Sequence, residues 1–231
     1  MLYTKEQVRD NIRNRNGKRV FYLGKEDRLT SEARDYLASQ RIEILSASEA
    51  KPQRYHLLSG GFAEEKPEYM THLNGDVLVR KTHPRIRFRG AIDALEAEML
   101  LCQQELPGLK EQLQEILELA RKLIRCDVLE EPVGDVILCG MDQQTQRMRS
   151  HFPQKYYGVA HFMPSCADSR EILLLNRLRC SARKAELLAV DAFSDREGNP
   201  TRLDIVQAMN RMSSMLYILM LQEKAKPPTI F

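Results

Sequence analysis

The stretch LRCSARKAE, residues 178–186, belongs to a longer segment in which apolar residues recur at helical spacing. The apolar face consists of Leu175, Leu178, Ala182, Ala185 and Ala189. A second stripe, at positions i, i+4 and i+7, carries Arg179, Arg183 and Glu186. The stretch therefore predicts a long bundle helix over residues 169–192 whose polar stripe faces something polar.

Helical periodicity continues on both sides of this segment. Two apolar stripes, separated by Pro107-Gly108, predict the first two helices of a bundle. They consist of Ile92, Leu95, Met99 and Cys102, and then of Leu109, Leu113, Ile116, Ala120 and Leu123. We expect a broken third helix over 133–149 and a fifth over 202–223, where Thr201 and Asp204 form a capping box. The predicted fold class is mainly α, a five-helix bundle.

The N-terminal part of the chain follows a different pattern. Two short apolar runs, VFYL and IEIL, flank a helical run that Thr30 or Ser31 caps, which predicts a small α/β module over residues 1–47. Residues 48–67 combine mixed charges, Gly-Gly and two prolines without periodicity, so we interpret them as a linker. The bundle domain is then expected over 68–231.

Length and charge limit the class of protein. The chain has 231 residues, enough for one full core and a small additional module, and its net charge of +3 does not indicate a nucleic-acid partner. The N-terminal sequence lacks the apolar core of a signal peptide, and the longest apolar run, Met215 to Leu221, is too short to span a bilayer. We expect a cytoplasmic protein without a nucleic-acid or membrane partner.

The cysteine pattern argues against a metal cluster. The chain has five widely spaced cysteines and no C-x-x-C pair. They are Cys102, Cys126, Cys139, Cys166 and Cys180. This spacing indicates neither a disulfide framework nor a structural zinc site, so we expect buried free thiols and no metal-ligating residues.

A polar line crosses the predicted last helix, which is otherwise strongly apolar. It consists of Gln207, Asn210, Ser214 and Tyr217. A buried polar group without a partner costs on the order of 1–3 kcal/mol, so this line and the stripe at Arg179 are expected to face a polar ligand. A plainer interpretation stays open, in which Arg183 and Glu186 form a solvated i, i+3 pair and Asn210 lies on the surface.

A basic cluster precedes the bundle. Asn74-Gly75-Asp76 is a turn signal that could present backbone N–H groups to an anion, and five Lys and Arg residues follow within 77–89. The common nucleotide-loop spacings are missing. Asp93 lies one turn into an otherwise apolar helix face, where a buried carboxylate would need a cation.

Several of these fragments resemble, in order, the signatures of the five-helix-bundle ATP:cob(I)alamin adenosyltransferases, and in particular those of ethanolamine utilisation. The family signature T-x-T-G-D-x-G corresponds here to Thr71 to Asp76, and G-T-x-D-E-L corresponds to Gly90 to Leu95. The signature R-x-x-x-R-x-x-E corresponds to Arg179, Arg183 and Glu186, and L-N-R-L-S corresponds to Met209 to Ser213. The first signature is degenerate after Asp76. The resemblance covers roughly residues 68–222, and the LTSEARDYL segment also looks like the N-terminal part of the ethanolamine-utilisation members.

The resemblance implies substrates and an assembly. It implies transfer of the 5′-deoxyadenosyl group of ATP to the cobalt of cobalamin with Mg²⁺ present, in a homotrimer whose active sites lie between neighbouring chains. Arg183 would hold the triphosphate and Asp93 would pair with Arg179 across the interface; these three are the expected catalytic residues. Thr71, Asn74, Gly75 and Asp76, together with Glu186 and Asn210, would bind the nucleotide and its metal.

The resemblance also assigns one aromatic residue. Phe162, in His161-Phe162-Met163-Pro164, stands where the family has an aromatic loop that replaces the lower cobalt ligand, although it could equally pack the bundle. His161 could be a surface histidine. Some ethanolamine-utilisation members carry a His followed by a C-C-x-x-C cluster, but no cysteine follows His56 in the corresponding stretch here.

The resemblance implies further partners and leaves two alternatives open. A reductase and ethanolamine ammonia-lyase are the implied protein partners, and a bacterial microcompartment is an implied location within the cytoplasm. One alternative is a corrinoid or nucleotide carrier without catalysis. The other is an adaptor of a metabolic compartment that docks through residues 1–47.

Overall fold

The chain divides into two compact units. The structure, a computed structural model, describes residues 1–15, 18–47 and 55–227, and its two units are Met1–Arg80 and Lys81–Phe231. This division lies after the linker that the sequence suggests at 48–67. Over the described ranges no helix is both long and apolar enough to cross a membrane.

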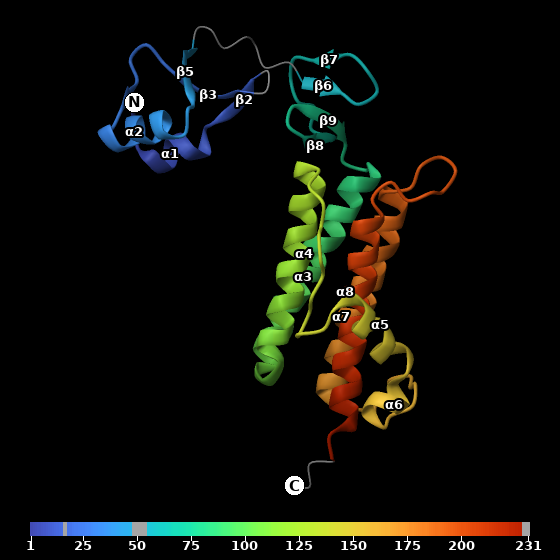
Figure 1. The fold of residues 1–231 in the computed structure, drawn as a ribbon. Helices are drawn as coiled ribbons and strands as arrows, with labels where there is room; N and C mark the ends of the chain where they lie inside the picture. The colour runs from blue at the N-terminus through green and yellow to red at the C-terminus, as the bar shows by residue number, and fades with distance from the viewer. Residues whose placement is uncertain (16–17, 48–54, 228–231) are drawn as a thin grey trace. The chain divides into compact units, whose positions relative to one another are not determined.

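The first unit begins with the predicted α/β module. Its elements are β1 (Leu2–Tyr3), α1 (Lys5–Asp10), β2 (Arg13–Arg15), β3 (Lys18–Leu23), β4 (Arg28–Leu29), α2 (Ser31–Ser39) and β5 (Glu43–Ser46). Strands β3 and β5 pair in parallel around α2, which confirms the expected β-α-β unit (Figure 1). The Thr30 side chain caps α2 by accepting from the amide of Ala33 at 3.2 Å. Val8, Phe21 and Leu37 are buried in a small core of its own.

The rest of the first unit is a four-stranded sheet in the order β7-β6-β9-β8. Its strands are β6 (Tyr55–Leu57), β7 (Phe62–Ala63), β8 (Met70–Asn74) and β9 (Val77–Arg80). The linker interpretation of 48–67 is therefore wrong for 55–63, where β6 and β7 form. Backbone pairing across the sheet holds these strands although their sequence has no clear apolar period. Residues 48–54 lie outside the described residues. The expected turn connects β8 to β9, and Gly75 adopts a positive φ of 50° there.

The second unit is built on four long helices that pack side by side (Figure 1). They are α3 (Pro84–Glu105), α4 (Lys110–Leu129), α7 (Arg170–Ala192) and α8 (Leu203–Ala225). Helix α7 lies between α3 and α8, and its predicted apolar stripe is buried. Its N-terminus is capped by Ser169, whose hydroxyl accepts from the amide of Ile172. A single core of Leu, Ile, Met and Ala side chains fills the bundle.

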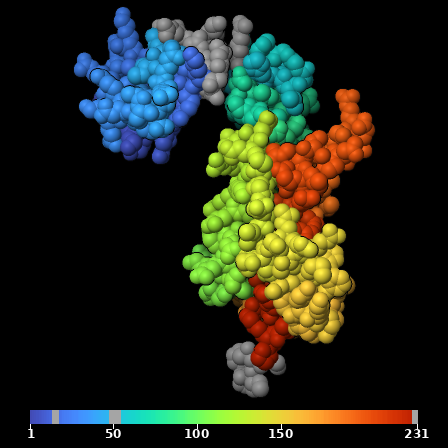
Figure 2. Space-filling view, viewed as in Figure 1, coloured from blue at the N-terminus to red at the C-terminus, as the bar shows by residue number. Residues whose placement is uncertain are grey.

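The segment between α4 and α7 differs from the sequence prediction. Instead of a broken helix over 133–149, the structure has only α5 (Gln143–His151) and the short α6 (Pro153–Tyr157), preceded by an irregular segment. Glu130 and Gly134 adopt positive φ angles, which end the helical path. In Figure 2 the segment that carries α5 and α6 (yellow) covers part of α8 (red), with which both helices are in contact.

The predicted capping box of α8 is not formed. The Thr201 hydroxyl donates to the carbonyl of Phe193 at 2.9 Å, whereas Asp204 accepts from the amide of Val133 at 3.0 Å and pairs with Arg202. Thr201 thus binds the end of α7. Asp204 binds Arg202 at the start of its own helix and also fixes the irregular segment after α4.

The buried carboxylate of the bundle is Asp127, whereas Asp93 is exposed. Asp127 accepts from Nε of Arg85 at 2.7 Å and from Nε of Arg89 at 2.6 Å, which joins the end of α4 to the start of α3. Asp93 follows Ile92, which is fully buried, and the helical turn of about 100° per residue rotates it out of the core. The expectation that Asp93 is buried by its own chain is therefore wrong.

The cysteines are also only partly as expected. Cys102 and Cys126 are buried, Cys139 is half-buried, and Cys166 and Cys180 are exposed. Burial, together with the smaller effect of Glu115, raises the pKa of the Cys139 thiol to about 11, so this thiol stays protonated at neutral pH. The prediction of five buried thiols is wrong for Cys166 and Cys180.

Candidate functional site

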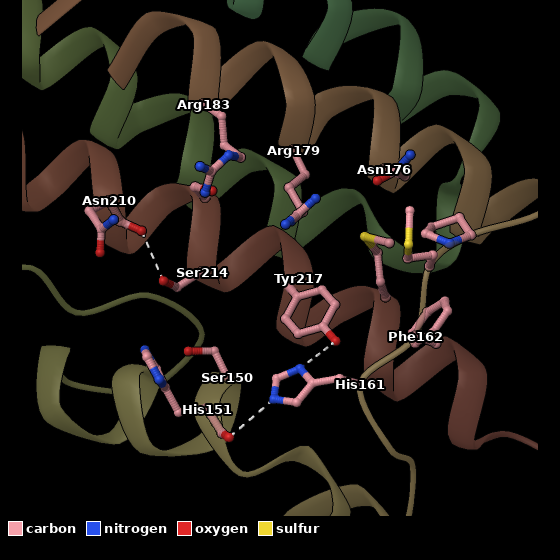
Figure 3. Close-up of a pocket in the computed structure, with 14 residues that line it drawn as sticks. Ser150, His151, His161, Phe162, Asn176, Arg179, Arg183, Asn210, Ser214 and Tyr217 are labelled. Carbon is pink, nitrogen blue, oxygen red and sulfur yellow. Dashed lines mark hydrogen bonds between the residues drawn. The ribbon is translucent and has the colours of Figure 1, made fainter. Parts of the chain in front are cut away.

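The second unit contains a cavity of about 710 Å³. It is lined by side chains of α7 and α8, by the end of α5 and by the segment that connects α6 to α7. Both predicted polar stripes contribute to it: Arg179 and Arg183 from α7, and Asn210, Ser214 and Tyr217 from α8 (Figure 3). The structure therefore brings together two stripes that the sequence analysis could only place on separate helices.

The polar end of the cavity is formed around Asn210. Its amide nitrogen donates to Oε1 of Glu186 at 2.7 Å, and its amide oxygen accepts from Arg211. The hydroxyl of Ser214 donates to the Asn210 carbonyl at 2.9 Å (Figure 3). The contacts with Glu186 and Arg211 fix the orientation of the side-chain amide, because each end of it has a defined partner, whereas Ser214 binds the backbone carbonyl. Asn210 is half-buried, which argues against the surface interpretation.

Arg183 stands beside this network without joining it. Its side chain is exposed and faces the cavity, and it forms no hydrogen bond or ion pair with any described residue. The solvated i, i+3 pair with Glu186 is not formed, since Glu186 binds Asn210 instead. Half-buried Arg211 adds a second positive charge nearby; partial burial lowers its pKa, as does Arg147, whereas Glu186 raises it. The polar end thus presents an uncompensated guanidinium to a ligand.

A stack of side chains occupies the middle of the cavity. The guanidinium carbon of Arg179 lies 5.3 Å from the centroid of the Tyr217 ring, within cation–π range. The Tyr217 hydroxyl is 3.1 Å from Nδ1 of His161, and the two rings are nearly parallel, with an interplanar angle of 3° (Figure 3). Tyr217 therefore joins α7 to the α6–α7 connection.

The far end of the cavity is apolar. It is lined by Phe162, Met163, Pro164 and Met220, and Figure 3 shows Phe162 at the opposite end from Asn210 and Arg183. The Phe162 ring lies 6.3 Å from the Tyr217 ring, at an angle of 30°, and Met163 is 92% exposed. Phe162 both packs against the bundle core and lines the cavity, so the two sequence interpretations of this residue are compatible.

The other predicted site residues lie elsewhere. Asp93 is on α3 and does not line the cavity. Thr71, Asn74, Gly75 and Asp76 form the β8–β9 hairpin of the first unit, where the Gly75 carbonyl lies 3.0 Å from Nδ1 of His72 and Asp76 pairs with His56 at 3.4 Å.

Four residues of the cavity wall, Ser150, His151, Asn176 and Met220, were not predicted from the sequence. Asn176 lies three residues before Arg179 on the same helix face, and this spacing was the available signal. Ser150 and His151 lie at the end of α5, where only the fold brings them to the cavity.

Grouped metal ligands are absent from the part of the chain that the structure describes. In the described ranges no three His, Cys, Asp or Glu side chains are grouped as a metal site. Mg²⁺ in phosphate-binding sites is usually held by substrate phosphates and one or two carboxylates, an arrangement that needs no such group.

Comparison with known proteins identifies the family. The sequence profile of the family described as cobalamin adenosyltransferase matches residues 62–223, which include α3 to α7, most of α8 and every residue that lines the cavity. The chain belongs to the cobalamin adenosyltransferase family. Its R-x-x-x-R-x-x-E residues, Arg179, Arg183 and Glu186, lie in or directly behind the cavity.

Two curated relatives of this adenosyltransferase cover nearly all of its length. The corrinoid adenosyltransferase EutT of Salmonella typhimurium is 31% identical over 90% of this chain and 86% of its own length. EutT of Escherichia coli K12 is 30% identical over the same shares of both chains. No solved structure matches the chain.

Proposed function

We propose that this cobalamin adenosyltransferase transfers the 5′-deoxyadenosyl group of ATP to the cobalt of cob(I)alamin, releasing triphosphate, in ethanolamine utilisation. The supporting observation is the two-ended cavity, in which the unpaired Arg183 faces one end and Phe162, Met163 and Met220 line the other. A nucleotide triphosphate suits the polar end, and the face of a corrin ring suits the apolar end.

In this reaction the protein has to position the substrates and stabilise the developing charge. Cob(I)alamin is itself a strong nucleophile that attacks the 5′ carbon of ATP, so no side chain has to form a covalent intermediate. Arg183 binds triphosphate oxygens and stabilises the charge that builds up on the leaving group. Asn210, whose orientation is fixed by Glu186 and Arg211, positions the nucleotide.

Mg²⁺ fits this arrangement as part of the ATP substrate. The triphosphate oxygens would carry most of its coordination, and Glu186, which accepts a hydrogen bond from the Asn210 amide, would be available as a carboxylate. When bound, the ion would neutralise phosphate charge. We also propose that the β8–β9 hairpin, with Thr71, Asn74, Gly75 and Asp76, binds phosphate through backbone N–H groups.

The apolar end is assigned to the lower face of the corrin. Phe162 would take the place of the lower cobalt ligand and exclude water from that face. Removing a σ-donating ligand makes reduction of cobalt to Co(I) easier, so a packed aromatic ring there favours the reactive state. Its position between Tyr217 and Lys224, whose Nζ lies 5.4 Å from the ring centroid, supports this role.

Assembly as a homotrimer would complete the site. Asp93 is exposed and has no partner within the described residues, and Arg179 has no carboxylate partner among them either. We propose that Asp93 of one chain pairs with Arg179 of a neighbouring chain beside the nucleotide. The resulting adenosylcobalamin would supply ethanolamine ammonia-lyase, and a reductase would supply Co(I), in the cytoplasm or in a microcompartment within it.

The test is an anaerobic assay with chemically reduced cobalamin and ATP, in which the Co(I) spectrum is followed. Its ATP-dependent loss, with one triphosphate released per adenosylcobalamin formed, is the expected result. Binding of both ligands without loss of Co(I) would favour the carrier alternative. If deletion of residues 1–47 leaves turnover intact but abolishes association with a compartment, that module serves as an adaptor as well.

A further inference from the structure

The connection between α6 and α7 lines the cavity. Gly158 ends α6 with a φ of 67°, and residues 159–164 have no regular secondary structure. Within the described chain no backbone N–H or C=O of 159–164 forms a hydrogen bond. This segment nevertheless carries Phe162 and Met163, two of the side chains at the apolar end.

One side chain of this segment forms hydrogen bonds at both ends of its ring. His161 Nε2 lies 3.2 Å from the carbonyl oxygen of His151, and Nδ1 lies 3.1 Å from the Tyr217 hydroxyl (Figure 3). A carbonyl can only accept, so Nε2 carries the proton and donates it. Nδ1 of the neutral ring is then an acceptor, and the Tyr217 hydroxyl donates to it. The contacts thus fix one tautomer.

The partner hydroxyl is itself held in place. Tyr217 belongs to α8, and the Arg179 guanidinium of α7 lies over its ring. His161 therefore links the segment to α5 through His151 and to α8 through Tyr217, whose ring is in contact with α7. The His161 imidazole thus joins the α6–α7 connection to α5 and to α8.

We propose that His161 is a positioning residue that holds residues 159–164 against α8 and thereby sets the place of Phe162 and Met163 over the apolar end of the cavity. The expected effect of His161 on the kinetics rests on the proposed function, in which the apolar end of the cavity binds the corrin. Loss of the His161 contacts loosens the corrin side of the site and leaves the Arg183 side intact.

The first test concerns the tautomer and needs no activity. The chain has five histidines, so the His161 signals in a long-range ¹H–¹⁵N spectrum are assigned by their loss in His161→Gln. The expected pattern is a single tautomer with the proton on Nε2 and an unprotonated Nδ1. A proton on Nδ1, or the averaged shifts of a freely exchanging imidazole, would overturn the proposal.

The second test measures how firmly the segment is held. The chain has no tryptophan, and Met163 is almost fully exposed, so Met163→Trp introduces a single fluorescent reporter. Adding His161→Ala or Tyr217→Phe is expected to lower the anisotropy of this tryptophan. Adding Tyr156→Phe, the control, removes a hydroxyl from a tyrosine outside the cavity and is expected to change nothing. Equal anisotropy in all four proteins contradicts a tether.

The third test separates the two ends of the site by kinetics. His161→Ala and Tyr217→Phe should raise KM for cob(I)alamin roughly tenfold while KM for ATP stays within about twofold. His161→Asn, whose amide oxygen can still accept from Tyr217, should recover part of the corrinoid affinity. An equal rise of both KM values would overturn the positioning role. Absence of adenosyl transfer by the wild-type protein would refute the proposed function, while the tautomer and anisotropy would still decide the role of His161.

Discussion

Asn210 donates a 2.7 Å hydrogen bond from its side-chain amide to Glu186, and this contact leaves Arg183 without an acidic partner. Glu186 lies three residues after Arg183 on α7, where an i, i+3 ion pair would otherwise be expected. Because the carboxylate is turned toward α8, the positive charge of Arg183 faces the cavity uncompensated. The contact thereby prepares the polar end of the site for an anion.

Removal of this charge should impair catalysis without unfolding the protein. Arg183→Ala is expected to lower kcat/KM for ATP at least tenfold, or about 1.4 kcal/mol, with little change in Tm, because Arg183 supports no other described residue. The matched control is Lys184→Ala, which removes the same charge from an exposed neighbour outside the cavity. Wild-type kinetics in Arg183→Ala would mean that this guanidinium does not bind the triphosphate.

The Asp127 ion pairs should dominate the stability of the bundle end. Asp127→Asn leaves Arg85 and Arg89, which are mostly buried, without their carboxylate, and we expect a loss of about 3 kcal/mol in the free energy of unfolding. Asp191→Asn breaks a pair with Arg87 that is about half exposed, and it should cost less than about 1 kcal/mol. Urea denaturation followed by circular dichroism measures both. Similar losses in the free energy of unfolding for the two variants would contradict the inference that a buried ion pair costs more to break than an exposed one.

Stability should fall as the pH drops below the ordinary pKa of histidine. Burial lowers the pKa of His83 below 6.5, Arg85 and Arg89 lower it further, and Asp127 partly opposes them. The unfolded state therefore binds more protons between the folded pKa and 6.5, so stability is complete above pH 6.5 and is lost as the pH falls toward the folded pKa.

His83 also caps helix α3, and a variant that keeps the cap without titrating serves as the control. Nδ1 of His83 accepts from the Arg85 amide at 3.3 Å at the start of α3, which requires the unprotonated ring. His83→Asn keeps a capping acceptor but cannot titrate, so its Tm should fall less between pH 7.5 and pH 5.5 than that of the wild type. Parallel Tm curves for the two proteins would exclude His83 as the source.

The proposed contact between chains calls for a double-mutant cycle. Asp93→Asn and Arg179→Gln should each weaken both assembly and turnover, since each leaves one charge of the pair without its partner. Exchanging the charges with Asp93→Arg and Arg179→Asp should restore part of the assembly, read by analytical ultracentrifugation. Additive losses, with a coupling energy below about 0.5 kcal/mol, would show that the two side chains do not meet.

The cysteine spacing and the lack of a grouped ligand set in the described residues lead to a metal prediction. Activity should depend on added Mg²⁺, and treatment with a chelator should be fully reversed by Mg²⁺ alone. Elemental analysis of the purified protein should find no tightly bound zinc or iron. A near-stoichiometric transition metal would contradict this expectation.

The sequence by itself determined the features that depend on one helix or on local chain chemistry. Periodicity identified the buried stripe of α7, short apolar runs marked the strands before and after α2, and Thr30 marked the start of α2. It also placed Arg179 and Arg183 on a common face, because a fixed rotation per residue relates their positions. Periodicity overestimated helix at 133–149, where buried residues such as Val133 and Val136 lie on an irregular path instead.

Tertiary structure alone decided which side chains are partners. The sequence pointed to Asp93 as the buried carboxylate, but Asp127 holds that position, and Glu186 binds Asn210 instead of an arginine. The double hydrogen bond of His161 joins residues 10 and 56 positions apart in the chain. Periodicity fixes how a side chain is oriented about its own helix axis, whereas its partner depends on how the helices pack and where the connections cross them.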